Sequence, residues 1–255
     1  MWADQEKISV SGRVDHDLTN ELTLFARAGY THKKTKTQLE PNFYGGSIFG
    51  YDSPGGVYPE GAWASVPPGA SNDPVPGSTS GGDFVRRLVE FGPRSADIKE
   101  DIFNSVVGAK GTFMESDWEF GLSYSTIRFK QDSPNIILSG LNSYINGSNG
   151  SLNLFEPIPQ EVVDEVSYTQ KRDADSSNWT ADLVVTGDTP WELAGGNVAY
   201  AGLVEFAKEW YNDDSDDISM SGDNFDGASA GGGSRKRSAA GAEISLPVVD
   251  SVELT

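Results

Sequence analysis

Apolar and polar residues alternate one by one in several separate stretches of this chain. In the cleanest stretch Trp118, Phe120, Leu122 and Tyr124 are apolar, and the residues between them are polar or glycine. A β-strand points successive side chains to opposite faces, whereas a helix would scatter these four around its circumference. The period of two therefore predicts strands with one apolar and one polar face.

The same alternation recurs along the chain and predicts seven strands, most of them paired in hairpins. They are expected near residues 8–15, 22–31, 101–113, 118–130, 178–186, 198–206 and 238–247, and residues 252–255 look like the opening of an eighth. Phe25 breaks the pattern of its strand. The 29 Gly, 13 Pro and 11% aromatic residues suit strands and turns better than helices.

The connections between the predicted strands alternate in length. Short turns alternate with long segments. The short turns lie near residues 16–21, 114–117, 188–197 and 248–251, and the long segments at about 38–96, 131–176 and 212–236. In an outer-membrane barrel every second connection lies on the same side of the membrane, and the connections of one side are short while those of the other are long. No such rule applies to a soluble sandwich. The predicted fold class is an all-β antiparallel meander, part of a large transmembrane β-barrel with long extracellular loops.

Composition and motifs exclude several other classes of protein. No apolar stretch approaches the roughly 20 residues of a membrane-spanning helix, and the mean hydropathy is −0.41. The net charge of −19 disfavours nucleic acid as a partner. There is no cysteine, and no nucleophile elbow, phosphate loop or metal-ligand motif is present. We therefore expect neither catalysis nor a cofactor.

The strand count predicts a section of a barrel. Bacterial outer-membrane barrels have an even number of strands, at least eight, and open edges are not viable in lipid. With connections this long, a large barrel needs a chain several times longer than 255 residues. The first residues also lack the basic and apolar regions of a signal peptide. We expect an interior section or a truncated product of a longer protein.

Several segments carry a family resemblance. They are Arg86–Arg94, Val107–Gly111 with Asp117–Phe120 and Ser123–Ser125, Gly202–Phe206 with Lys208–Glu209, and Ala242–Leu254. In order, they resemble the barrel half of the TonB-dependent receptors of the Gram-negative outer membrane. Gly202–Phe206 is similar to the family's Gly-x-Glu-Tyr-Arg strand, although Ala207 stands where the arginine is often found.

The resemblance covers most of the chain outside the long segments. It implies a barrel of roughly 22 strands around a globular plug in the cell outer membrane. It also implies energy-coupled uptake of a scarce ligand, such as a siderophore, vitamin or oligosaccharide, driven by TonB. Neither a plug nor a TonB box is expected within these residues, so the ligand is not identified.

The first long segment combines abundant Gly and Pro with many aromatic side chains. A flexible backbone that carries aromatic rings is typical of a recognition surface. The candidate ligand-binding residues are Tyr44, Phe49, Tyr51, Tyr58 and Trp63. The alternative is that these rings pack on one another in a compact Ω-loop.

The third long segment is acidic and ends in a basic cluster. Asp213, Asp214, Asp216 and Asp217 are candidate Ca²⁺ ligands, because clustered carboxylates bind hard cations, although their spacing differs from an EF-hand. A solvated loop is the simpler interpretation. The run Arg235–Arg237 either binds lipopolysaccharide phosphates or balances the charge of the acidic loop. His16 and His32 are isolated and predict no site.

The two faces of the predicted strands have different expected surroundings. Trp118, Phe120, Leu122 and Tyr124 are expected to face lipid on the convex side, so outer-membrane lipid and lipopolysaccharide are expected partners. Polar residues of the other face are expected to line the interior and contact a plug: Arg13, Arg27, Lys110, Glu119, Asp182 and Glu205. The alternative function is a secreted carbohydrate-binding or carbohydrate-degrading β-protein, in which the apolar residues are buried between two sheets.

Overall fold

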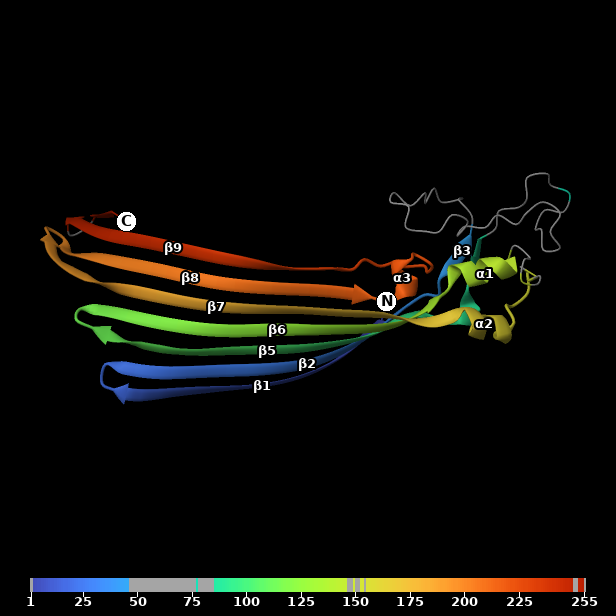
Figure 1. Cartoon of the computed structure of the whole chain (residues 1–255), viewed down its shortest axis with the longest axis horizontal. Coiled ribbons are helices and arrows are strands. Elements are labelled where there is room, and N and C mark those ends of the chain that lie inside the picture. The colour runs from blue at the N-terminus through green and yellow to red at the C-terminus, as the bar shows by residue number, and fades with distance from the viewer. Residues whose placement is uncertain are drawn as a thin grey trace.

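A computed structural model describes residues 2–45, 77, 85–145, 149, 152–153, 155–249 and 252–254. Its main feature is a single antiparallel sheet of eight strands in the order β1-β2-β5-β6-β7-β8-β9-β10 (Figure 1). Each strand is hydrogen-bonded to the strand that precedes it in this order, so the sheet is a meander. Within the described residues β1 and β10 are its two edges, and the sheet is open. The predicted all-β antiparallel meander is confirmed.

The strands extend well beyond the stretches of clear alternation. Their bounds are Trp2–Thr19 (β1), Leu22–Leu39 (β2), Arg94–Phe113 (β5), Ser116–Ile136 (β6), Ser167–Leu193 (β7), Gly196–Ser215 (β8), Gly231–Val249 (β9) and Val252–Leu254 (β10). β7 begins at Ser167, although the sequence predicts a connection as far as residue 176. Residues 167–176 are mostly polar on both faces, so they carry no alternation to detect.

Short turns and long connections lie at opposite ends of the sheet (Figure 1). Two residues join β1 to β2, β5 to β6 and β7 to β8. Long connections join β2 to β5, β6 to β7 and β8 to β9. The predicted alternation of short and long connections is therefore present in the structure.

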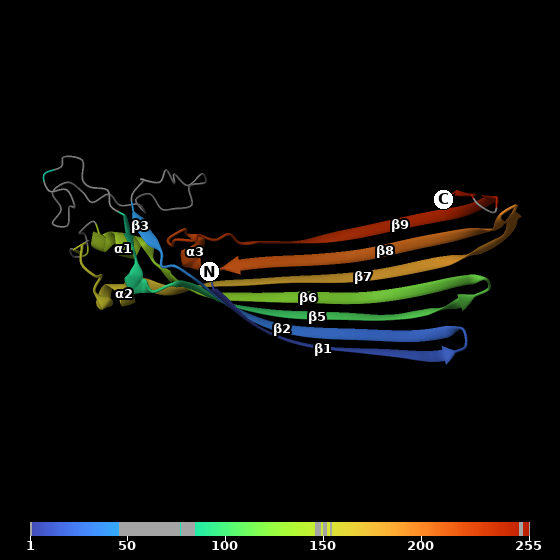
Figure 2. The same ribbon diagram turned by 180° about the vertical axis from the view of Figure 1, so that it is seen from behind.

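The three long connections fold together into what we call the cap, formed by the described residues between 40 and 93, between 137 and 166, and between 216 and 230. The cap contains a small hairpin, three short α-helices and a 3₁₀ helix, and it lies beyond one end of the sheet (Figure 2). Its elements are β3 (Phe43–Gly45), β4 (Val85–Arg87), η2 (Val89–Phe91), α1 (Leu138–Ile145), α2 (Gln160–Val166) and α3 (Asp217–Met220). No helix among the described residues is both long enough and apolar enough to cross a membrane.

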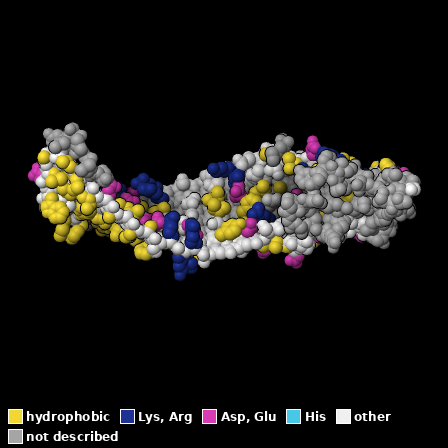
Figure 3. Space-filling view, turned by 90° about the horizontal axis from the view of Figure 1, so that it is seen from above, with side chains coloured by type: hydrophobic (Ala, Val, Ile, Leu, Met, Phe, Trp, Pro, Cys, Tyr) yellow, Lys and Arg dark blue, Asp and Glu magenta, His cyan; other side chains and the backbone are white. Residues whose placement is uncertain are grey.

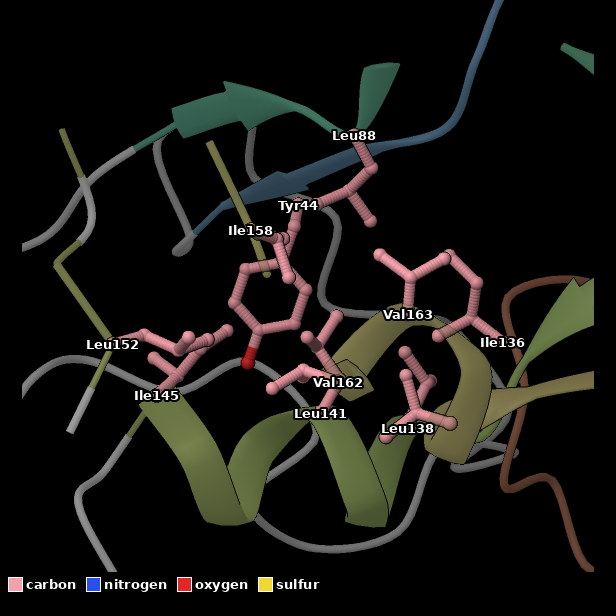
Figure 4. Close-up of a cluster of buried hydrophobic side chains, with 11 residues drawn as sticks. Tyr44, Leu88, Ile136, Leu138, Leu141, Ile145, Leu152, Ile158, Val162 and Val163 are labelled. Atoms are coloured by element: carbon pink, nitrogen blue, oxygen red, sulfur yellow. The ribbon is translucent and has the colours of Figure 1, made fainter. Parts of the chain in front are cut away.

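The largest buried hydrophobic cluster belongs to the cap and the adjoining end of β6. It consists of Tyr44, Leu88, Ile136, Leu138, Leu141, Ile145, Leu152, Ile158, Val162, Val163 and Val166. Figure 4 shows these side chains gathered between α1, α2 and the β3–β4 hairpin. In contrast, many large hydrophobic residues of the sheet are exposed, among them Val10, Val14 and Phe206. The sheet therefore has an apolar face with little burial of its own.

Candidate functional site: an apolar band and a cap

The strand register arranges the exposed apolar residues in rows that run across the sheet. Each of the four residues predicted to face lipid lies in a different one of these rows. Trp118 lies between Gly111 and Val185, Phe120 between Ala109 and Leu183, Leu122 between Val107 and Ala181, and Tyr124 between Ser105 and Trp179. Because directly paired residues point to the same face, each row presents its side chains together.

The rows continue over the neighbouring strands and form what we call the apolar band. Its larger members are Val10, Val14, Leu24 and Tyr30 on β1 and β2, Phe103, Val107, Trp118, Phe120, Leu122 and Tyr124 on β5 and β6, and Trp179, Leu183, Val185, Tyr200, Val204, Phe206, Trp210 and Ile244 on β7 to β9. On β8 the band runs from Tyr200 to Trp210. A tilted strand needs about 9–11 residues to cross a hydrocarbon core, so the band has the matching width.

Charged side chains replace apolar ones on the same face toward the cap. The next rows contain His32, Asp101, Arg128 and Asp175, then Lys34, Lys99, Lys130 and Asp173, then Lys36, Asp97, Asp132 and Lys171. Several of these side chains pair across strands, with 2.8 Å from His32 Nδ1 to Asp101 Oδ1 and 3.4 Å from Lys130 Nζ to Asp173 Oδ1. Figure 3 shows hydrophobic side chains along one side of the sheet near the short turns, and charged ones nearer its middle.

The opposite face of the sheet, here called the polar face, carries many polar and charged residues together with a few apolar ones such as Phe25, Val184 and Leu203. The register places Arg13 opposite Arg27, Lys110 opposite Glu119, and Asp182 opposite Glu205, all on the face away from Trp118. The six residues predicted to line the interior therefore share one face. This face also holds cross-strand ion pairs, such as Arg237 Nη2 to Glu205 Oε1 at 2.7 Å.

The basic run Arg235–Arg237 is divided between the two faces. Arg235 and Arg237 lie on the polar face and pair with Glu209 and Glu205 of β8, each at 2.7 Å. These two arginines therefore pair with glutamates of a strand and not with the aspartates of the acidic segment. Lys236 points to the apolar face, where it lies opposite Lys208.

The prediction of a calcium site at Asp213, Asp214, Asp216 and Asp217 is wrong. No group of three or more histidine, aspartate or glutamate side chains with the geometry of a metal site occurs among the described residues. Asp213 and Asp214 are consecutive residues of β8, so the strand directs their carboxylates to opposite faces. Asp213 and Asp216 have protein partners instead.

Asp213 is buried and accepts hydrogen bonds from Arg172 Nε at 2.8 Å and from the Tyr211 hydroxyl at 2.8 Å. The hydrogen bond from Arg172 lowers the pKa of Asp213 to about 2. Asp216 caps α3, where it accepts from Ser219 N at 2.9 Å, and it also accepts from Lys171 N at 2.8 Å. Burial raises the pKa of Asp216, but these backbone hydrogen bonds outweigh it and leave that pKa below its ordinary value.

Of the five aromatic residues predicted to bind a ligand, only Tyr44 lies within the described residues. Phe49, Tyr51, Tyr58 and Trp63 lie outside them. Tyr44 is fully buried in the cap, so its assignment as a surface contact for a ligand is wrong. Its hydroxyl donates to Asn142 Oδ1 of α1, and its ring meets Phe225 edge-on at 6.4 Å. Tyr44 thus joins all three long connections.

Polar contacts between the three connections fix the cap further. Asp223 accepts from Ser139 N at 2.6 Å through its carboxylate, and from Leu138 N at 3.1 Å through its backbone carbonyl. Arg86 Nη1 donates to Glu156 O at 2.6 Å, and Ile158 N donates to Glu90 Oε1 at 3.0 Å. The connections are therefore one packed unit, which the sequence reasoning did not predict.

A sequence signal for the cap helices was nevertheless present. Leu138, Leu141 and Ile145 recur with the three-to-four-residue spacing of a helix, as do Val162, Val163 and Val166. All six side chains are buried in the cap. Both stretches are short. The first precedes the Asn- and Ser-rich run of residues 146–151 and the second follows Pro157 and Pro159, and such neighbours are typical of loops.

The geometry defines an all-β chain: one open meander sheet with an apolar band on one face, a polar opposite face and a cap at one end. Neither the models of known protein families nor the curated protein sequences match this chain. Function is therefore inferred from the band, the polar face and the cap.

Proposed function

We propose that this chain forms part of the wall of an outer-membrane β-barrel, and that the barrel is that of a TonB-dependent receptor. The observation that carries the proposal is the apolar band. It is exposed, continuous across the sheet from β1 to β9, about as wide as a hydrocarbon core, and bordered by charged rows on the cap side. In water such a face is costly, because burying apolar area is the main stabilising term of a fold.

Two further features support an outer-membrane barrel. The long connections all lie at one end, where they build a cap that a ligand arriving from outside meets first. The polar face carries charged residues such as Arg13, Lys110 and Glu119, which suit a water-filled interior that contacts a plug. The open edges at β1 and β10 pair with further strands in a barrel of roughly 22.

In the proposed role, the receptor captures a scarce ligand of the siderophore, vitamin or oligosaccharide class at the cap. TonB then supplies the energy for its passage. A secreted carbohydrate-binding protein has less support. Among the described residues no second sheet covers the apolar band, whereas such a protein would bury its apolar residues between two sheets.

Membrane insertion is tested by placing arginine on one face or the other of β6. Phe120→Arg puts a charge in the middle of the apolar band, which costs about 2–4 kcal/mol at the centre of a bilayer. Ser123→Arg puts the same charge on the polar face and is the matched control. We expect Phe120→Arg to reduce both co-flotation with phosphatidylcholine liposomes and the lipid-dependent gain of β-structure by circular dichroism. Equal behaviour of the two variants contradicts the proposal.

Transport is tested separately, in cells that produce the protein containing this chain. Labelled compounds of the siderophore, vitamin and oligosaccharide classes are offered to the cells. We expect accumulation of the compound that is taken up to stop when the proton gradient is collapsed, because uptake is energy-coupled. Accumulation that persists without the gradient contradicts the receptor assignment while leaving membrane insertion intact.

A further inference from the structure

A shallow groove of about 250 Å³ lies on the apolar face where β6, β7, β8 and β9 adjoin. Its lining includes Leu122, Trp179, Ala181, Phe206, Lys208 and Lys236. Ala181 lies in the row between Leu122 and Phe206, so a small side chain separates two large ones and leaves the depression. Trp179 forms one wall and contacts Tyr124, with ring centroids 4.7 Å apart. We call this depression the β7–β8 groove.

Two lysines lie at the cap-side end of the β7–β8 groove. Lys208 and Lys236 are direct cross-strand partners on the apolar face, in the same row as Trp179. Like charges placed directly opposite each other on a sheet are destabilising. The adjoining rows hold Ser177, Trp210 and Ser234 on one side, and Ala181, Phe206 and Ser238 on the other. No carboxylate therefore occupies the pair's own row or an adjoining row on β7, β8 or β9.

Several other basic residues of the sheet have carboxylate partners nearby. On the polar face of the same two strands, Arg235 pairs with Glu209 and Arg237 with Glu205. On the apolar face nearer the cap, Lys130 pairs with Asp173 at 3.4 Å and Lys36 with Asp97 at 3.6 Å. Lys208 instead places its ammonium 4.2 Å from the centre of the Trp210 ring. The lysine pair thus concentrates positive charge within the apolar band, one row from its cap-side border.

We propose that the β7–β8 groove and the lysine pair form a site for a lipid that carries a phosphate and an acyl chain. The phosphate binds between the ammonium groups of Lys208 and Lys236, which relieves their repulsion. The acyl chain lies over Ala181, between Trp179 and Phe206. This inference rests on the proposed membrane location, and it adds that one position on the band selects anionic lipid.

The test uses the full chain in neutral detergent micelles, with native mass spectrometry to count bound lipid. Short-chain phosphatidylglycerol is the anionic probe, and phosphatidylcholine of the same chain length is the zwitterionic one. Each lysine near an anionic lipid surface contributes about 1 kcal/mol, so Lys208→Gln with Lys236→Gln is expected to weaken phosphatidylglycerol binding about ten- to thirty-fold. Binding of phosphatidylcholine should stay unchanged.

Two further variants separate this site from general electrostatics. Arg13→Gln with Arg235→Gln removes the same charge from the opposite face, at two residues that do not line the groove, and should leave the preference for phosphatidylglycerol intact. Ala181→Leu fills the groove while keeping both lysines, and it should weaken binding of both lipids several-fold. An equal loss in the arginine variant, or no loss in Ala181→Leu, overturns the proposal.

The outcome also distinguishes this inference from the proposed function. A chain that enters micelles normally, yet binds the two lipids equally well, overturns the lipid site alone. A chain that enters neither detergent nor lipid overturns the membrane location and the lipid site together.

Discussion

Phe25 packs on the polar face over Gly108 of the adjacent strand. Its side chain is only 6% exposed, and a Cβ atom added to Gly108 would lie 2.4 Å from Phe25 Cζ and 2.3 Å from Phe120 O. The guanidinium of Arg27 lies 5.5 Å from the centre of the Phe25 ring. The residue that breaks the alternation of its strand therefore fills the space that a glycine leaves. Sequence reasoning identified the exception but not its partner, which lies on another strand.

Gly108→Ala is expected to destabilise the sheet by about 1–3 kcal/mol, because the added methyl group must displace the Phe25 ring and backbone of β6. Gly12→Ala on β1 is the matched control, since a Cβ there meets nothing within 4 Å. Urea unfolding in detergent measures both variants. Equal stability of the two would show that β5 and β6 can separate without cost at this point.

The Arg172–Asp213 pair predicts acid sensitivity at the cap end of β7 and β8. The folded pKa of Asp213 is about 2, below its ordinary value of 3.8. A lowered pKa stabilises the fold above the ordinary value, and this contribution is lost as the pH falls from about 4 toward 2. We expect the melting temperature to fall over this window, and to fall less in Asp213→Asn.

At pH 6, Asp213→Asn should cost about 1–2 kcal/mol, since it removes hydrogen bonds to a charged group. Asp217→Asn, in the first turn of α3, is the control. It should melt at the same temperature as the unchanged chain, both at pH 6 and in the acid window. An identical acid response in Asp213→Asn and the unchanged chain would assign the sensitivity to other carboxylates.

At the scale of elements, alternation predicted the turn-side half of each long strand but not the cap-side half. On β6 the apolar face ends at Tyr124, and beyond it Arg128, Lys130 and Asp132 occupy the same face. There Ile127 and Phe129 lie on the other face, so the apolar side chains change sides and the pattern of the first half ends, whereas hydrogen bonding along the ladder continues. The sequence Gly231–Gly233 likewise predicts a loop. It nevertheless forms the start of β9, because the backbone of β8 is available there for hydrogen bonding.

The candidate sites were predictable to different degrees for the same reason. Trp118, Phe120, Leu122 and Tyr124 share a face because alternation within one strand decides it. The partners of Tyr44 and Asp213 lie 98 and 41 residues away along the chain. Contacts of this kind depend on how connections fold back, which a local pattern does not contain.

The cap is expected to unfold separately from the sheet. Leu141 is fully buried in the cap cluster, so Leu141→Ala should destabilise the cap by about 2–4 kcal/mol. Hydrogen exchange measured by mass spectrometry should speed up in α1, α2 and β3, while the amides of β6 and β7 near the short turns keep their protection. Val89→Ala, at a residue that is 60% exposed in the cap, is the control. Faster exchange throughout the sheet would show that cap and sheet unfold together.

At the scale of the whole molecule, the open sheet exposes unpaired backbone groups along β1 and along the part of β9 that β10 does not cover, in addition to the apolar band. We expect the isolated chain to associate or precipitate in plain buffer, despite its net charge of −19, and to become monodisperse in detergent. Size-exclusion chromatography with light scattering and circular dichroism measures this. A monodisperse monomer that melts cooperatively without detergent would contradict the membrane location.

The strands rise far past the apolar band. On β2 the band ends at Tyr30, and the strand continues to Leu39 before the cap begins. At about 3.3 Å per residue this adds roughly 30 Å of strand, and a tilt of about 40° leaves a height of roughly 20–25 Å. In the proposed orientation the cap therefore lies well above the lipid headgroups on the outer side of the membrane. A ligand bound at the cap must pass along the inner face of these strands before it reaches the plane of the membrane. The cap itself is accessible to antibodies that do not contact lipid.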